Sequence, residues 1–180
     1  MKQYIAFLRG INISGKNKIS MPDLRLGFET LGYTNVSTYL NSGNVVFETD
    51  EDIKRARANL EGMVSARFGF DIPVYIIEKE NLERILGCAP AWWGTEDKDK
   101  YDNLIFILSD ETADEIAAAI GDASEGMEQI QVFENVIFWT FERESYRKCN
   151  WWKKTAGAGI ADKLTIRTAA TVRKCTGGAK

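Results

Sequence analysis

The most constraining feature of the sequence is an order of strands and helices that occurs twice. In the first half, short apolar runs at 3–9 and 72–77 have the character of β-strands. Residues 36–47 alternate as a hairpin around the turn 41–44. Apolar residues recur at helical spacing over 21–31 and 53–69. The resulting order, βαββαβ, is that of a ferredoxin-like sheet.

The second half repeats this pattern without repeating the residues. Its predicted elements are a helical turn at 80–86, a loop rich in tryptophan and acidic residues at 89–102, a strand at 104–108, a helix at 111–120 capped by Asp110, a hairpin at 129–141, a helix at 144–155 and a basic tail. We therefore predict an α+β protein of two tandem ferredoxin-like halves with antiparallel sheets, residues 1–80 and 81–180.

Composition is that of an ordinary globular protein, with 44% hydrophobic and 27% charged residues among 180. Arg9 interrupts the first apolar run before a signal-peptide core could form, and no run reaches the length of a membrane span. The three cysteines lack Cys-x-x-Cys spacing. These features predict a cytoplasmic protein with reduced thiols, in which Cys175 is buried or, alternatively, reactive.

The chain has no histidine, which excludes Ser-His-Asp and Cys-His catalysis and most zinc sites. We predict neither a metal nor a cofactor, and no catalytic residue is assigned. Whether the protein is an enzyme stays open at this point.

Charge is unevenly distributed, although the net charge is only −3. Residues 1–26 carry a net charge of +4 and residues 142–180 a net charge of +7, whereas residues 27–141 carry −14. Such ends favour an anionic partner, although charged runs also simply solvate exposed faces. A pI of about 5.2 argues against a dedicated nucleic-acid-binding protein.

Topology predicts one cluster of polar and basic residues. In a βαββ unit, the loop after the first strand (10–20) and the hairpin turn (41–44) lie at the same edge of the sheet, because the third strand runs antiparallel between the first two. The residues placed at this edge are Arg9, Asn12, Ser14, Lys16, Asn17, Lys18, Asn41, Ser42 and Asn44. Cations and amides around glycines suit a phosphate, a carboxylate or a nucleotide. For the hairpin turn alone, the simpler interpretation is that tight turns use Asn, Ser and Gly.

The segment from Gly10 to Asn17 nearly matches the phosphate-binding loop G-x-x-x-x-G-K-[ST]. Asn17 stands where that motif has the hydroxyl that holds magnesium, and the helix is predicted to begin only at residue 21. The sequence therefore argues against a nucleoside-triphosphatase loop.

Two further features suggest binding. The tail 163–174 has Arg167, Thr171 and Lys174 at spacings of four and three, which on a helix would form one face. Arg167 and Lys174 would then join the anion site. The tryptophan pairs at 92–93 and 151–152 either stack on bases or fill gaps between sheet and helices.

Three N-terminal segments carry a family resemblance. They are Tyr4–Asn12 (YIAFLRGIN), Gly15–Met21 (GKNKISM) and Tyr39–Phe47 (YLNSGNVVF), joined by Thr165, Ile166, Arg167 and Thr171 in the tail. With these the chain resembles domain-of-unknown-function family 1697 (DUF1697), a bacterial family. The resemblance implies an α+β fold with two related ferredoxin-like halves and names no reaction.

The leading hypothesis is therefore binding of a small anionic ligand at the edge formed by 9–18 and 41–44. Alternatives are nucleic-acid binding and a non-catalytic interaction module. No membrane partner is predicted, and the oligomeric state is not set by the sequence.

Overall fold

A computed structural model describes residues 1–178, which divide into two compact units. The first unit comprises Met1–Arg84 together with the segment that begins at Lys174, and the second comprises Ile85–Arg173. The boundary predicted at 80/81 falls inside helix α3 (Lys79–Gly87). Within the described part of the chain, no helix is long and apolar enough to cross a membrane.

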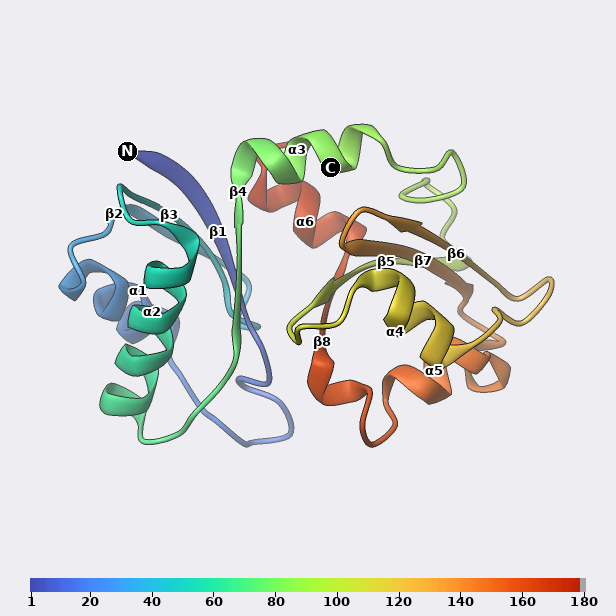
Figure 1. Cartoon of the computed structure of the whole chain (residues 1–180), viewed down its shortest axis with the longest axis horizontal. Helices are drawn as coiled ribbons and strands as arrows, with labels where there is room; N and C mark the ends of the chain where they lie inside the picture. The colour runs from blue at the N-terminus through green and yellow to red at the C-terminus, as the bar shows by residue number, and fades with distance from the viewer. Residues whose placement is uncertain (179–180) are drawn as a thin grey trace. The chain divides into compact units, whose positions relative to one another are not determined.

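The first unit is a four-stranded sheet with helices α1 and α2 on one face (Figure 1). Its elements are β1 (Lys2–Leu8), α1 (Met21–Thr30), β2 (Thr34–Tyr39), β3 (Asn44–Thr49), α2 (Ile53–Phe68) and β4 (Val74–Glu78). The strand order is β2-β3-β1-β4, and every neighbouring pair is antiparallel.

Local sequence signals set the ends of the two helices. The Ser20 side chain caps α1 by accepting a hydrogen bond from the Asp23 backbone N–H, and Asp52 caps α2 in the same way. Gly69 ends α2 in the left-handed conformation. The buried faces of α1 and α2 then meet the sheet around Phe28 and Phe47, whose rings pack edge to face with centroids 5.2 Å apart.

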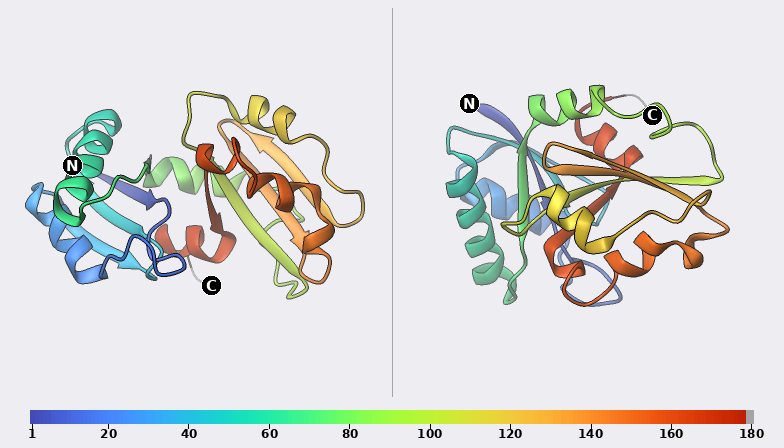
Figure 2. Two further views of the ribbon diagram at one scale, coloured as in Figure 1. Left: turned by 90° about the horizontal axis from the view of Figure 1, so that it is seen from below. Right: turned by 45° about the vertical axis from the view of Figure 1, so that its right-hand side comes forward.

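The second unit repeats this architecture (Figure 2). Its elements are β5 (Lys100–Ile107), α4 (Ala113–Ile120), β6 (Glu128–Phe133), β7 (Val136–Glu142), the short 3-10 helix η1 (Tyr146–Lys148), α5 (Asn150–Thr155), the 3-10 helix η2 (Ala161–Lys163), β8 (Leu164–Thr168) and α6 (Ala169–Cys175). Strand order β6-β7-β5-β8 has the same connectivity as the first sheet. The predicted fold of two ferredoxin-like halves is thus confirmed.

Two sequence interpretations were wrong in the second half. Residues 164–168 form strand β8 and not a helix, because they pair along the free edge of β5, with Ile166 opposite Ile105. The helix α6 starts only at Ala169, so Arg167, Thr171 and Lys174 do not share a helix face. Helix α4 is capped by Thr112, which forms a capping box with Glu115, and not by Asp110.

The three cysteines are free thiols. Cys149 and Cys175 are buried, and Cys88 is exposed. Of the two alternatives for Cys175, a buried or a reactive thiol, the structure shows a buried one.

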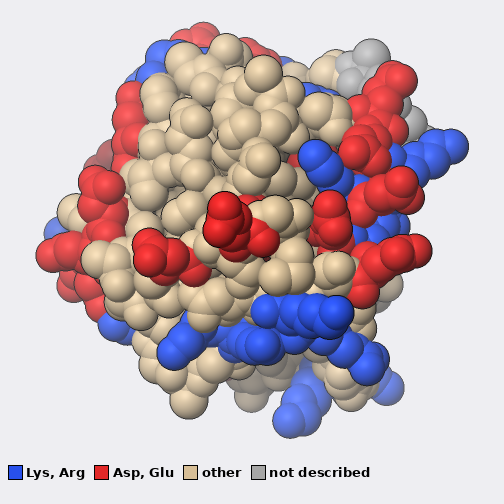
Figure 3. Space-filling model, turned by 90° about the vertical axis from the view of Figure 1, so that its right-hand side faces the viewer, with Lys and Arg blue, Asp and Glu red and all other residues tan. Residues whose placement is uncertain are grey.

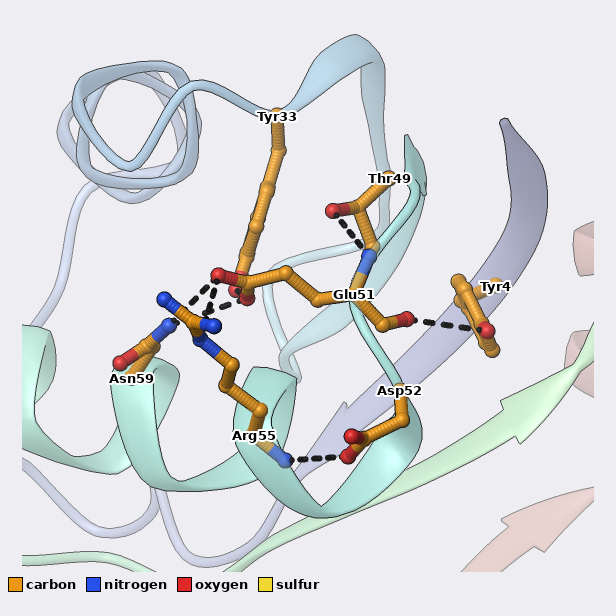
Figure 4. A network of polar contacts seen from close by, with 7 residues as sticks. All are labelled: Tyr4, Tyr33, Thr49, Glu51, Asp52, Arg55 and Asn59. Carbon is orange, nitrogen blue, oxygen red and sulfur yellow. Dashed lines mark hydrogen bonds and ion pairs between the residues drawn. The ribbon is translucent and has the colours of Figure 1, made fainter.

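A polar network ties the end of β3 to α2 in the first unit (Figure 4). The carboxylate of Glu51 accepts hydrogen bonds from the Tyr33 hydroxyl at 2.6 Å and from Asn59 Nδ2 at 3.0 Å, and pairs with Arg55 at 3.3 Å. The Tyr4 hydroxyl donates to the Glu51 backbone carbonyl. Burial and the bond to Glu51 raise the pKa of Tyr33 well above its ordinary value.

Tyr33→Phe is expected to lower the free energy of unfolding by about 1–2 kcal/mol, because a hydrogen bond to a charged group is lost from a buried ring. Urea denaturation measures the change. Tyr39→Phe, in the half-exposed end of β2, is the matched control and should shift stability by less than about 0.5 kcal/mol. Equal stability of both variants would contradict a structural role for the Tyr33 hydroxyl.

Candidate anion site

The loop after β1 and the β2–β3 turn are joined in the structure, as the topology predicted. Asn12 makes the junction: its Nδ2 donates to the Asn41 carbonyl at 2.7 Å and to the Ile19 carbonyl at 2.9 Å. Its Oδ1 accepts from the Ile19 N–H at 2.9 Å. One side chain thus closes the loop upon itself and fastens it to the hairpin.

Close backbone packing completes the junction. The Leu8 N–H donates to the Gly43 carbonyl at 2.8 Å. Gly43 has φ +80°, and a Cβ built there would lie 2.8 Å from Leu8 Cβ. Only glycine satisfies both the conformation and the space at this point of the turn.

The loop has an unusual backbone. Five of its residues have positive φ, namely Gly10, Asn12, Ser14, Gly15 and Asn17. Three of them are not glycine, and such conformations are retained where the surrounding structure holds them, often at ligand-binding loops. The bridge between Ile13 and Lys16 makes the tip of the loop a tight turn.

A shallow pocket of about 440 Å³ lies between the loop, the hairpin turn and the start of α1. Its lining residues are Asn12, Gly15, Lys18, Ile19, Ser20, Met21 and Asn41. Lys16 and Lys18 are exposed, and neither forms an ion pair with any residue that the structure describes. Asp23 follows Ser20 by three residues, accepts a hydrogen bond from it and pairs with Arg67 at 3.7 Å.

The remaining asparagines of the predicted site serve the backbone. Asn17 Nδ2 donates to the Gly10 carbonyl at 3.0 Å. Asn44 is fully buried and its Nδ2 donates to the Tyr39 carbonyl and to Ser42 Oγ. These amides hold the turns in shape, which is the simpler interpretation of the hairpin turn. The groups left to face a ligand are therefore chiefly the two lysines and the loop backbone.

The other three predicted cations, Arg9, Arg167 and Lys174, do not line this pocket. Arg9 directly follows β1, is half-buried and donates its backbone N–H to the Pro73 carbonyl. Arg167 lies on β8 of the second unit, where its Nη1 donates to Thr165 Oγ1 and to the Ile166 carbonyl. Lys174 is exposed on α6. The participation of these three residues in anion binding stays a prediction.

Residues 10–17 do not form the phosphate-binding loop G-x-x-x-x-G-K-[ST] of nucleoside triphosphatases. In that motif a helix begins directly after the glycine and lysine, whereas α1 begins at Met21. The sheet is antiparallel and not the parallel sheet of such proteins. Among the described residues no group of three Cys, Asp or Glu side chains is placed to hold a metal ion.

Sequence reasoning missed a second pocket, of about 580 Å³, in the second unit. Its lining residues are Tyr101, Asn103, Trp139, Phe141, Arg143, Tyr146, Trp152, Thr155, Ala156 and Ile166. They come from three strands and the segment of η1 and α5, so no local motif marks them. The only sequence signal was the tryptophan pair 151–152, of which Trp151 is buried and Trp152 is 40% exposed.

The fold described above defines the class of the protein: it is an α+β protein with two tandem ferredoxin-like units. A family model described as "Protein of unknown function (DUF1697)" matches residues 1–138. The chain belongs to this family.

A solved structure agrees over more of the chain. It is described as the structure of conserved bacterial protein SP0830 from Streptococcus pneumoniae. It is 29% identical, covers 98% of this chain and 97% of its own, and has a TM-score of 0.85. No curated protein matches the chain. The family model ends before the tail residues 165–171, whereas the structural match spans nearly the whole chain.

Proposed function

We propose that the first unit binds a small anionic ligand, carrying a phosphate or carboxylate, in the pocket between the 10–20 loop and the 41–44 turn. The observation that carries the proposal is the junction made by Asn12, which brings two separate segments together around a pocket beside two lysines. The three sequence motifs of the family resemblance include both segments.

The chemistry of the pocket favours a small charged group. Lys16 and Lys18 supply positive charge without a described acidic partner, so an incoming anion does not have to displace an existing ion pair. Backbone N–H groups near left-handed residues and the start of α1 offer further donors to an anion. Asp23 opposes this charge, but its pairing with Arg67 reduces the opposition.

Lys16→Ala with Lys18→Ala is expected to weaken binding of a phosphorylated metabolite by about tenfold or more, since each charge-assisted contact contributes about 1 kcal/mol or more. A thermal-shift screen of phosphorylated and carboxylated metabolites finds the ligand, and calorimetric titration measures the affinity. The matched control is Lys54→Ala with Lys98→Ala, which removes two exposed lysines outside the pocket. Equal weakening in both double variants would show that net charge alone governs binding and would refute the site.

Nucleic-acid binding is a second candidate, and one observation favours it. On the face shown in Figure 3, Lys and Arg side chains gather in a band, on the side where Figure 1 places α5. The segment 142–155 holds five cations against two acidic residues and includes the exposed Trp152. Retention on immobilised RNA or DNA at about 50 mM salt, lost as salt rises, is the expected behaviour. Absence of retention at that salt removes this candidate.

A further inference from the structure

The pocket of the second unit has walls made of aromatic rings. Tyr101 and Phe141 are stacked, with an interplanar angle of 4° and centroids 5.5 Å apart. Trp152 packs edge to face on both Phe141 and Tyr146, at 5.3 Å and 4.8 Å. Tyr101 and Trp152 keep 38% and 40% of their surface exposed. The rings therefore hold one another in place and still offer apolar surface to a ligand.

A buried amide also lines the pocket. Asn103 is 6% exposed and lies on the same face of β5 as Tyr101, two residues away. Its Nδ2 makes a 3.3 Å hydrogen bond to the Tyr101 carbonyl, and its Oδ1 has no hydrogen-bond partner among the described residues. This oxygen is not among the fully buried polar atoms that lack a partner, so it is open to the pocket and can accept a hydrogen bond from a ligand.

One cation, Arg143, lines the pocket, and four more follow it in the segment 142–155. Arg143, Arg147, Lys148, Lys153 and Lys154 are all exposed, and in the described chain none of them forms an ion pair. The guanidinium of Arg143 lies 4.5 Å from the centroid of the Tyr101 ring, at the edge of the pocket. Glu142 and Glu144 are the acidic residues of the same segment, which leaves it with a net charge of +3.

We propose that this pocket binds a nucleotide, with the base against the exposed rings and the phosphate against Arg143 and the other cations of the segment 142–155. A purely apolar ligand would leave Asn103 without a partner, and a simple anion would leave the rings unused. A flat heterocycle with adjacent donor and acceptor groups can bind both the rings and Asn103: its face packs on the rings, and its polar edge pairs with the asparagine amide. The volume of about 580 Å³ is within the range of small-molecule pockets.

The test is calorimetric titration of the full chain with AMP, GMP, CMP and UMP, and with ribose 5-phosphate as the ligand that lacks a base. Lys16→Ala with Lys18→Ala serves as the background, so that the pocket of the first unit does not contribute. We expect at least one mononucleotide to bind at least tenfold more tightly than ribose 5-phosphate. Equal affinities for all five ligands would overturn the proposal. So would the absence of binding both of every mononucleotide and of a six-nucleotide single strand.

Variants assign the binding to the pocket. Trp152→Ala is expected to weaken the mononucleotide about 5- to 150-fold, the range of base–aromatic stacking. Asn103→Ala should reduce the difference among the four bases, which loss of packing alone does not do. Trp92→Ala, a half-buried tryptophan that does not line the pocket, is the matched control and should leave affinity unchanged. An unaltered affinity in Trp152→Ala would contradict the proposal.

The nucleotide has two possible sources, a free molecule or an unpaired position of a strand. A six-nucleotide single strand that binds at least tenfold more tightly than the mononucleotide, and loses that binding in Trp152→Ala, identifies a strand. Equal or weaker binding of the strand identifies the free nucleotide. Either result supports base recognition in the pocket.

Discussion

Replacing Asn12 with alanine is expected to lower the free energy of unfolding by about 2–4 kcal/mol and to abolish ligand binding at the loop. The variant loses three hydrogen bonds, two from Nδ2 and one to Oδ1, each contributing about 0.5–1.5 kcal/mol. It also places alanine at φ +54°, which asparagine tolerates better. The loop would lose both its closure and its connection to the hairpin.

Denaturation in urea gives the stability, and the same protein is titrated with the ligand found in the metabolite screen. Ser14→Ala is the matched control, since Ser14 has φ +49° in the same loop but is exposed. It should cost less than about 1 kcal/mol and, because Ser14 does not line the pocket, leave binding intact. An Asn12→Ala protein as stable as Ser14→Ala would show that the junction does not depend on this side chain.

Glu128→Ala is expected to destabilise the second unit by about 3–5 kcal/mol. Glu128 is 5% exposed and accepts three N–H bonds: from the backbone of Ser124 at 2.9 Å, from the backbone of Trp151 at 3.0 Å and from Trp139 Nε1 at 3.2 Å. Alanine leaves these donors unsatisfied inside the protein and opens a cavity beside two tryptophans.

Chemical denaturation followed by tryptophan fluorescence measures this loss. Glu125→Ala, an exposed position three residues earlier, removes the same charge and should shift stability by less than about 0.5 kcal/mol. Because Trp139 also lines the aromatic pocket, Glu128→Ala should weaken nucleotide binding as well. Equal stability of the two variants would show that Glu128 is not a structural acceptor.

The fold was predictable because local and global signals agree. The helical spacing over 21–31 and 53–69 and the alternation in 36–47 each indicated the element that the structure contains. The strand in the tail is not predictable from the spacing of its polar residues, because it forms only by pairing with the distant strand β5. The β-branched Thr165 and Ile166 favour a strand once the edge of β5 is present.

The candidate site was predictable in place and only partly in detail. Strand order alone put 10–20 beside 41–44, and the bond from Asn12 to Asn41 confirms that proximity. The sequence does not show which side-chain amides form hydrogen bonds within the protein. Asn17 and Asn44 were therefore expected to bind the ligand, whereas in the structure they donate to backbone carbonyls. The aromatic pocket was missed because its residues meet only after the second sheet and α5 have packed together.

Backbone amide chemical shifts during titration with the phosphorylated ligand test anion binding at the loop most directly. We expect saturable shifts confined to residues 10–20 and 41–44, with one dissociation constant shared by both segments. We expect these shifts to disappear in the double variant Lys16→Ala with Lys18→Ala. Shifts scattered over exposed cations in both units, or changes in the loop with none in the turn, would contradict it.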